Sequence, residues 1–331
     1  MIRLNRKPAN GRSVDSPPEK VAILQLGKLG DMILTTPLFN ALKQLYPQAR
    51  TTVIAAQASA LVPLYLSSVD EVIAVPRGFR QYPTLATRLR TDRFDLYIDL
   101  KNHRSTTSRL IAEMIRADRT IVHRANMAHK SGEQELPAPA SPGHYVDLAL
   151  APMTVLAPGR SFRRNPSVTI PQDAYHAVDS QIDPGEYGLV TVNISAGHSS
   201  RYWKPEKWEE LIGKLSQRFS VAVLSSPGDR SLADEICTMR KRARPIRTET
   251  ILEAAAVVER SRAVISPDTS IIHLASALRR PCVGLYPPIE SNARIFAPLS
   301  EPHIVLMPPP DGTIADIATD DVLDAARRVV S

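Results

Sequence analysis

Apolar residues along the chain follow two alternating patterns, which together predict a regular succession of β-strands and α-helices. Short apolar runs between turn residues are typical of buried parallel strands, whereas apolar residues that recur every three or four positions indicate helices packed on a sheet. In the first half the expected strands are residues 21–26, 51–55, 71–75, 96–100 and 121–122. The expected helices are residues 32–46, 80–91 and 105–116, with a short helix between the second and third strands. This alternation predicts a doubly wound parallel sheet with helices on both faces.

The second half of the chain repeats the same alternation. Its expected strands are residues 188–192, 221–224, 263–266, 282–286 and 304–307. Its expected helices are residues 206–218, 230–241, 250–260 and 320–330. A second doubly wound sheet is therefore predicted, and ligands of such sheets bind at the carboxyl ends of the strands.

The stretch over residues 157–188 is rich in proline and glycine and marks the expected domain boundary. A predicted helix over residues 145–156 precedes it, after a predicted loop over residues 125–143. Two domains are the usual organisation for a chain of 331 residues. We expect a flexible basic arm over residues 1–20, a first domain over residues 21–165 and a second domain over residues 166–331.

The net charge of +7 raises the question of which partners the surface meets. A basic surface suits nucleic acid, anionic lipid headgroups or an acidic substrate, and the simplest interpretation is a solvated surface with no specific role. Aromatic residues make up only 5% of the chain and do not alternate with Lys or Arg, which argues against a single-strand nucleic-acid binder. Neither an apolar secretory segment in the first twenty residues nor a run of ~20 apolar residues occurs.

The histidines are scattered through the sequence, and the two cysteines, Cys237 and Cys282, stand far apart. Spacing of this kind predicts neither a zinc site nor a disulfide framework. A reducing cytoplasmic compartment fits best. We expect Cys282 to be a small buried hydrophobic residue.

The most informative motif runs from Asp268 to His273, between the expected strand and a helix-like segment. A helix that opens on Thr269-Ser270 offers free backbone N–H groups and the positive end of the helix dipole, and such a corner binds phosphate. Because Asp268 and His273 flank this corner, a phosphate there would also meet a carboxylate and an imidazole. The combination favours a sugar diphosphate over a bare phosphate.

Gly27, Gly30 and Asp31 lie in the turn after the first expected strand, where nucleotide-binding folds place a glycine-rich loop. The third glycine of the dinucleotide fingerprint is absent, and a carboxylate at position 31 would repel a pyrophosphate, which argues against a dehydrogenase. Asp31 can cap the following helix, or it can deprotonate an alcohol as a general base. The spacing favours the cap, and the two roles are compatible.

Other charged residues also follow expected strands. Arg201 lies in a loop before a helix, where a guanidinium can clamp a diphosphate or simply form a surface ion pair. Asp229 begins a helix, where it can cap the helix or accept a hydrogen bond from a ribose hydroxyl. Lys101, His103 and Arg104 follow the fourth expected strand and supply positive charge that suits an anionic acceptor.

Taken together, these motifs resemble glycosyltransferase family 9, whose best-known members are the ADP-heptose:lipopolysaccharide heptosyltransferases. The resemblance is collinear from about Val21 to Val330. The stretches that carry it are residues 23–37, 94–100, 193–203 and 268–277. The last of these looks like the family signature Asp-Thr/Ser-Gly-x-x-His-x-x-x-Ala, with Ser270 in place of the usual glycine.

The resemblance implies a GT-B fold, in which two facing Rossmann-like doubly wound domains enclose a cleft. It also implies inversion at the transferred sugar without a metal or other cofactor. The N-terminal domain would bind the acceptor and the C-terminal domain the nucleotide sugar. The closing helix, about residues 320–330, is expected to pack back on the N-terminal domain.

The family's residue roles fall on named positions of this chain. The catalytic base falls on Asp31. Donor-binding roles fall on Arg201, Asp229, Asp268, Thr269, Ser270 and His273, with Ser195, Ser199 and Ser200 as sources of hydroxyl contacts to phosphate. Acceptor-binding roles fall on Gly30, Lys101, His103 and Arg104.

We therefore expect an inverting glycosyltransferase that moves a heptose-like sugar from a nucleotide diphosphate, with ADP-heptose favoured, to a lipopolysaccharide core or related cell-surface glycan. Its expected location is the cytoplasm, peripheral on the inner-membrane surface, with an anionic glycolipid acceptor and no nucleic-acid partner. Alternatives are a family member that uses another nucleotide sugar, or a non-catalytic GT-B nucleotide-binding protein. A nucleotide-sugar epimerase on a similar architecture is a further alternative, and it would need no acceptor.

Overall fold

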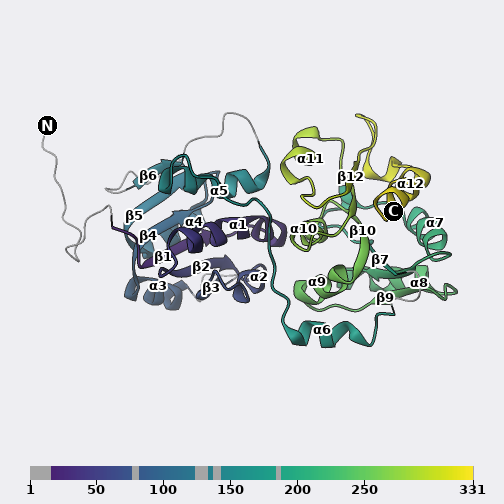
Figure 1. The fold of residues 1–331 in the computed structure, drawn as a ribbon, viewed down its shortest axis with the longest axis horizontal. Helices are drawn as coiled ribbons and strands as arrows, with labels where there is room; N and C mark the ends of the chain where they lie inside the picture. The colour runs from purple at the N-terminus through teal and green to yellow at the C-terminus, as the bar shows by residue number, and fades with distance from the viewer. Residues whose placement is uncertain (1–15, 77–81, 124–132, 137–142, 184–187, 331) are drawn as a thin grey trace, which may run out of the picture. The chain divides into compact units, whose positions relative to one another are not determined.

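The computed structural model describes residues 16–76, 82–123, 133–136, 143–183 and 188–330. Most of the expected N-terminal arm and most of the expected 125–143 loop lie outside these residues. The chain divides into two units, each with its own sheet (Figure 1). The first unit comprises residues 1–140 and 147–163, and the second comprises residues 141–146 and 164–331.

The first unit is built on a six-stranded sheet in the order β3-β2-β1-β4-β5-β6, and every neighbouring pair of strands is parallel. Its strands are β1 (Lys20–Gln25), β2 (Arg50–Ala56), β3 (Glu71–Val75), β4 (Arg93–Asp99), β5 (Arg116–His123) and β6 (Glu133–Leu136). Its helices are α1 (Leu29–Leu45), α2 (Leu61–Leu64), α3 (Tyr82–Thr91) and α4 (Thr106–Met114). The central strand β1 is buried from Val21 to Gln25, as its apolar run predicts.

The second unit repeats this plan with a six-stranded parallel sheet in the order β12-β11-β10-β7-β8-β9. Its strands are β7 (Leu189–Asn193), β8 (Ser220–Leu224), β9 (Ala243–Ile246), β10 (Ser261–Pro267), β11 (Cys282–Leu285) and β12 (His303–Leu306). Its α-helices are α6 (Gln172–Asp179), α7 (Pro205–Leu215), α8 (Arg230–Cys237), α9 (Ile251–Glu259), α10 (Ser270–Ala277), α11 (Glu290–Phe296) and α12 (Thr319–Val330). Short 3₁₀ helices are η3 (Ser199–Arg201), η4 (Pro227–Asp229) and η5 (Ile314–Asp316). The remaining helix, α5 (Tyr145–Leu156), begins in the segment that groups with the second unit and continues in the first.

Both sheets have the doubly wound strand order, in which the direction of winding reverses at one point near the middle. This switch point lies between β1 and β4 in the first unit, and between β7 and β10 in the second. Loops that leave adjacent strands there diverge to opposite faces and leave room for a ligand at the carboxyl ends of the strands. The prediction of two doubly wound α/β halves is therefore confirmed, and the residues after these four strands are the first candidates for chemistry.

Two tryptophans anchor the core of the second unit. Trp203 and Trp208 are buried and meet edge to face, with 4.7 Å between ring centroids. The indole N–H of Trp203 donates to the carbonyl of Ile317 at 3.0 Å, so its one polar atom is satisfied. Pro205 occupies the first turn of α7, as expected from its missing N–H. Both tryptophans therefore pack rather than bind a ligand.

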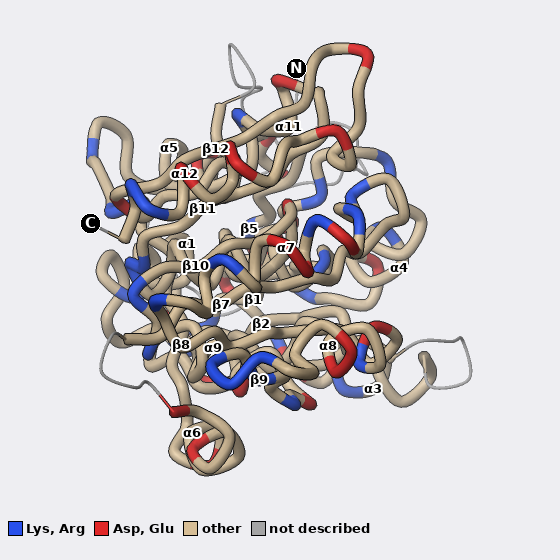
Figure 2. Tube along the Cα trace, turned by 90° about the vertical axis from the view of Figure 1, so that its right-hand side faces the viewer, with Lys and Arg blue, Asp and Glu red and all other residues tan. Residues whose placement is uncertain are grey.

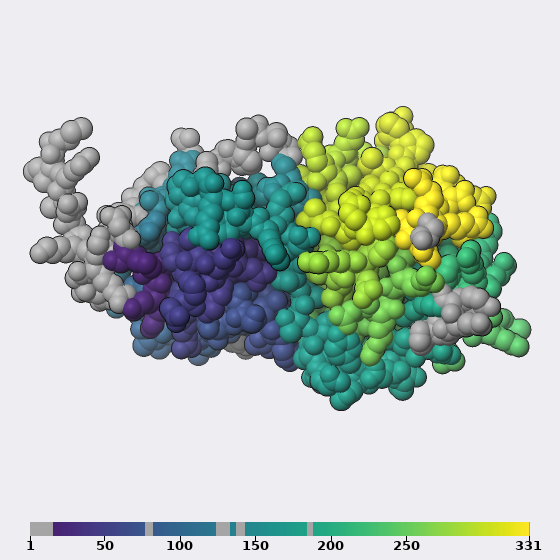
Figure 3. Space-filling view, in the orientation of Figure 1, coloured from purple at the N-terminus to yellow at the C-terminus, as the bar shows by residue number. Residues whose placement is uncertain are grey.

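The closing helix α12 is amphipathic, with Val322, Leu323 and Val329 among its buried residues. It packs on α7 and on β10, β11 and β12 of its own unit. Figure 3 shows it in yellow at the surface of the second unit. Its expected packing on the N-terminal domain stays a prediction.

Among the described strands and α-helices, the sequence does not predict β6, β9, α6 and α11. The strands β6 and β9 are the outermost strands of their sheets, and their sequences are polar (EQEL) or contain proline (ARPI). Edge strands bury fewer side chains and tolerate proline, so they lack the apolar run that marks a central strand. The helix α6 lies inside the proline-rich stretch where the domain boundary is expected.

Candidate active site

The switch point of the first sheet places a polar network under the start of α1. Gln25 ends β1, and although its side chain is buried, it has partners on both sides. Its Oε1 accepts from the N–H of Gly27 at 2.8 Å, and its Nε2 donates to Oγ1 of Thr35 at 2.7 Å. The Thr35 hydroxyl in turn donates to the carbonyl of Asp31 at 2.7 Å. This chain of hydrogen bonds fixes the turn that carries Asp31.

Asp31 lies in the first turn of α1, because the helix begins at Leu29 and not at residue 32 as predicted. It is therefore not the N-cap residue that the sequence suggests: Lys28 holds that position, and Oδ2 of Asp31 accepts from the backbone N–H of Lys28 at 2.9 Å, as the third residue of a capping box does. The residue is partly exposed. A carboxylate held in this way keeps a fixed position at the end of the strand, which is compatible with the predicted role as a base.

Gly27 leaves the space that the Asp31 side chain occupies. A Cβ at position 27 would lie 2.6 Å from both Cβ and Oδ2 of Asp31, closer than such atoms approach. Glycine is thus required at position 27 by close approach and not by a positive φ.

The predicted acceptor residues follow β4 in the same unit. The carboxylate of Asp99 at the end of β4 is buried, accepts from the backbone N–H of Lys101 at 2.9 Å, and also accepts from the Ser108 hydroxyl. Burial raises the pKa of Asp99, and these two hydrogen bonds and the charge of Lys101 only partly oppose the rise. Lys101 is half-buried, whereas His103 and Arg104 are exposed. Asp99 therefore fixes the start of a loop on which the side chains of His103 and Arg104 face solvent.

The switch point of the second sheet places an amide at the centre of another network. Nδ2 of Asn193, at the end of β7, lies 2.9 Å from Oγ of Ser266 and 3.2 Å from Oγ1 of Thr269. It also donates to the carbonyl of Ser195 at 3.0 Å. The Thr269 hydroxyl accepts from the N–H of Ile271 at 3.3 Å and so caps α10. These contacts join the ends of β7 and β10 to the helix N-terminus predicted to hold phosphate.

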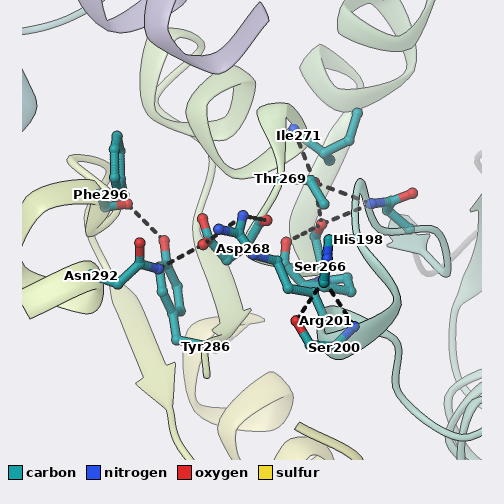
Figure 4. A network of polar contacts seen from close by, with 12 residues as sticks. His198, Ser200, Arg201, Ser266, Asp268, Thr269, Ile271, Tyr286, Asn292 and Phe296 are labelled. Carbon is teal, nitrogen blue, oxygen red and sulfur yellow. Dashed lines mark hydrogen bonds and ion pairs between the residues drawn. The ribbon is translucent and has the colours of Figure 1, made fainter. Parts of the chain in front are cut away.

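Arg201 and Asp268 meet beside this helix end (Figure 4). Nη1 of Arg201 lies 3.0 Å from Oδ2 of Asp268 and also donates to the Asp268 carbonyl at 3.1 Å. The Asp268 carboxylate accepts a further hydrogen bond from Nδ2 of Asn292 at 2.8 Å. The side chain of Asp268 is 5% exposed and that of Arg201 is 34% exposed. The arginine is therefore anchored at one nitrogen while part of its guanidinium remains accessible.

Asp229 does not cap α8, because its side chain accepts hydrogen bonds from elsewhere. Its Oδ2 accepts from the hydroxyls of Ser195 at 2.5 Å, Ser226 at 2.8 Å and Tyr202 at 2.9 Å. Burial raises the pKa of Asp229, but these three hydrogen bonds together outweigh it and leave the pKa below its usual value. The side chain is a fixed carboxylate, which suits the predicted contact with a ribose hydroxyl.

The three serines proposed as phosphate contacts differ in their surroundings. The Ser195 hydroxyl is buried and engaged, since it donates to Asp229 and accepts from the N–H of Ser226 at 2.7 Å. Ser199 and Ser200 are exposed in η3, and the Ser200 hydroxyl lies 2.8 Å from Nδ1 of His198. Ser195 therefore orders Asp229, while the other two lie at the surface near Arg201.

His273 is buried on α10, 4% exposed, with its ring 6.2 Å from that of Phe296. Its Nδ1 has no hydrogen-bond partner within the part of the chain that the structure describes. Burial, with smaller contributions from His144 and Arg201, lowers the pKa of His273 to about 3. The residue is thus a neutral imidazole, and its predicted contact with the donor sugar stays a prediction.

The depressed pKa of His273 predicts a specific loss of stability in acid. In the unfolded chain the histidine takes up a proton near pH 6.5, whereas the folded protein does so only near pH 3. The free energy of unfolding should therefore fall as the pH drops below about 6.5, by about 2 kcal/mol between pH 7 and pH 5 from this residue alone.

Urea unfolding at both pH values checks this, with His273→Phe expected to lose that part of the pH dependence. The control His176→Gln, at an exposed position, should keep it. Equal pH dependence in the protein and in His273→Phe would contradict the assignment.

Several polar residues of these networks were not singled out from the sequence as site residues. Gln25 and Asn193 are each the last residue of a buried strand. A polar side chain is unusual at a buried position, so this feature of the sequence could have marked both as site residues. Tyr202 gave no such signal. Asn292 lies in α11, a helix that the sequence does not predict.

Within the described parts of the chain, no three His, Cys, Asp or Glu side chains gather as a metal site would require. Among the same residues, no helix is both long and apolar enough to cross a membrane.

A family model and curated relatives that match the chain point to the same protein family. The family model described as glycosyltransferase family 9 (heptosyltransferase) matches residues 83–309. Lipopolysaccharide heptosyltransferase 3 of Escherichia coli is 23% identical over 281 residues, which cover 78% of this chain and 80% of that protein.

Solved structures agree with that result. A glycosyl transferase family 9 protein from Veillonella parvula superimposes with a TM-score of 0.81 at 18% identity, covering 94% of this chain and 97% of that one. E. coli heptosyltransferase WaaC with ADP gives a TM-score of 0.75 at 17% identity, covering 94% and 99%. These likenesses confirm the predicted GT-B fold class of two Rossmann-like domains.

Proposed function

Because this chain belongs to glycosyltransferase family 9 and is a glycosyltransferase, we propose that it transfers a heptose-like sugar from ADP-heptose to a lipopolysaccharide core or related glycan. The transfer inverts the anomeric centre and needs no metal. Relatives named lipopolysaccharide heptosyltransferases and a related structure that contains ADP support this choice of donor and acceptor.

The observation that carries the proposal is the arrangement at the switch point of the second sheet. Arg201, anchored on Asp268, stands beside the N-terminus of α10, whose end is ordered by Asn193 and Thr269. A guanidinium and a helix N-terminus together suit a diphosphate, because both present N–H donors and positive charge. Asp229 is the fixed acceptor for a ribose hydroxyl in this proposal.

In the reaction, the acceptor hydroxyl oxygen forms a bond to the anomeric carbon while the bond from that carbon to the diphosphate oxygen breaks. Asp31 takes the proton of the attacking hydroxyl, which contributes roughly 10²–10⁴ to the rate. Arg201 and the start of α10 stabilise the negative charge that develops on the departing diphosphate. Gly30, Lys101, His103 and Arg104 contact the anionic acceptor.

We place the enzyme in the cytoplasm, peripheral on the inner membrane, because its acceptor is an anionic glycolipid. The net charge of +7 supports attraction to such a surface. Lys and Arg are spread along both units among Asp and Glu (Figure 2), so the attraction is expected to be weak and sensitive to salt.

Calorimetry with ADP, UDP and GDP tests the donor assignment. The proposal predicts that ADP binds and that UDP and GDP bind more weakly by at least tenfold. Tighter binding of UDP or GDP would point to a family member with another nucleotide sugar. No affinity for any of the three would favour a non-catalytic protein that retains the fold.

Gly27→Ala tests whether the position of Asp31 matters for transfer. The added methyl would overlap the Asp31 side chain, which must shift, so turnover is expected to fall at least tenfold while affinity for ADP is retained. Initial rates of ADP release measure the effect. Gly213→Ala on α7, where a Cβ meets only the Arg240 side chain at 3.5 Å or more, is the matched control and should leave turnover unchanged. Normal turnover in Gly27→Ala would show that the geometry of Asp31 is not critical.

A further inference from the structure

Asn292 is a polar residue of the donor site with no role assigned from the sequence. It lies in the first turn of α11, 24 residues beyond Asp268, and its Nδ2 donates to Oδ2 of Asp268 at 2.8 Å. Figure 4 shows its amide directed at the carboxylate from the side opposite Arg201.

The Asp268 carboxylate is thus held between an amide and a guanidinium. Arg201 reaches the same Oδ2 at 3.0 Å and the Asp268 carbonyl at 3.1 Å. A carboxylate that is only 5% exposed depends on such donors, since water cannot replace them easily. Losing the amide would remove one of the contacts that orient the Asp268 carboxylate, and the position of the Arg201 guanidinium on that carboxylate would be less well defined.

The helix that carries Asn292 is itself braced. The Tyr286 hydroxyl donates to the carbonyl of Phe296 at 2.7 Å, and the rings of Phe296 and Tyr145 stack with 5.6 Å between centroids. His144 approaches the next carbonyl, that of Ala297, at 3.0 Å. Asn292 therefore projects from a fixed backbone and can impose a position on Asp268.

We propose that Asn292 is a positioning residue for donor binding: it orients the Asp268 carboxylate, which in turn holds the Arg201 guanidinium where the donor diphosphate binds. This role rests on the proposed function, because it assumes that Arg201 meets a diphosphate. In this role Asn292 affects the affinity for the donor through Asp268 and Arg201, without contacting the donor itself.

The test is a double-mutant cycle read out by ADP affinity in calorimetry. Asn292→Leu keeps the size of the side chain and removes the N–H donor. It should weaken ADP binding about tenfold, which is the effect of losing one hydrogen bond between Arg201 and the charged diphosphate. In an Asp268→Ala background, the same Asn292→Leu change should have no further effect, because the residue through which it acts is gone. Ser291→Ala, at the exposed neighbouring position, is the control and should bind ADP as the unchanged protein does.

A purely structural role would give another pattern. Asn292→Leu would then lower the melting temperature without changing ADP affinity, and this result would overturn the proposal. Equal losses in both backgrounds would also overturn it, since Asn292 would act independently of Asp268. If Asp268→Ala does not fold, Asn292→Asp is measured in its place. The affinity of Asn292→Asp for ADP should be low at neutral pH. Relative to the wild-type protein, this affinity should recover as the pH falls, because the protonated carboxyl at position 292 can again donate to Asp268. No such recovery would reject the proposal.

The cycle also separates this inference from the proposed function. If the wild-type protein binds ADP and the Asn292 variants bind it with the same affinity, only the positioning role fails. If the unchanged protein binds no nucleoside diphosphate, both fail.

Discussion

Asp31→Asn is expected to lower turnover by about 10²–10⁴-fold, because the amide cannot accept the proton of the attacking hydroxyl. The variant keeps the shape of the side chain, and its Oδ1 can still accept from the N–H of Lys28, so the start of α1 should remain intact. Affinity for ADP should stay within a few-fold, since the groups proposed to bind the donor belong to the second unit. Steady-state rates of ADP release with acceptor present measure the loss.

A thermal melt provides the control for this variant. A melting temperature close to that of the unchanged protein, together with the lost turnover, would assign the effect to chemistry and not to folding. Near-normal turnover in Asp31→Asn would leave Asp31 as a helix cap only and would require a different base.

Arg201→Ala is expected to weaken ADP binding by about tenfold to a hundredfold, because hydrogen bonds to a charged group are lost along with the positive charge. Arg201→Lys should recover part of the affinity, since it restores the charge but not the planar guanidinium. Calorimetry at fixed ionic strength measures both variants.

The control for Arg201→Ala is Arg218→Ala, which removes one positive charge at an exposed position of the same unit. Its affinity for ADP should not change beyond a small effect of net charge. An unchanged dissociation constant in Arg201→Ala would remove this residue from the donor site.

The sequence was informative about the fold wherever strands are central. Apolar runs such as residues 21–25 and 263–266 are buried on both faces, so almost every position must be apolar. The edge strands β6 and β9 have no such requirement, and their polar or proline-containing sequences gave no signal.

Site residues could be found from the sequence when they lie shortly after a central strand. Asp31 and Asp268 each lie within a few residues of the carboxyl end of a switch-point strand, so strand prediction alone brought them to attention. The start of α1 at Leu29 was misplaced because Lys28 and Gly30 resemble turn residues, and the structure places Asp31 inside the first helical turn.

Partners that come from distant elements could not be predicted. The contact between Asn292 and Asp268 joins α11 to the residue after β10, 24 positions earlier in the chain, and nothing in the local sequence encodes it. The burial of His273 was readable in part, because it stands between Ile272 and Leu274 on an apolar helix, but the unpartnered state of its Nδ1 follows only from the three-dimensional packing.

The most direct test of the proposed heptose transfer is product analysis after incubation with ADP-heptose and a heptose-deficient lipopolysaccharide acceptor in the presence of a metal chelator. We expect one heptose added to the acceptor by mass spectrometry, stoichiometric release of ADP, and an anomeric configuration opposite to that of the donor by NMR. Release of ADP without sugar on any acceptor, retention of configuration, or dependence of transfer on an added metal would contradict it.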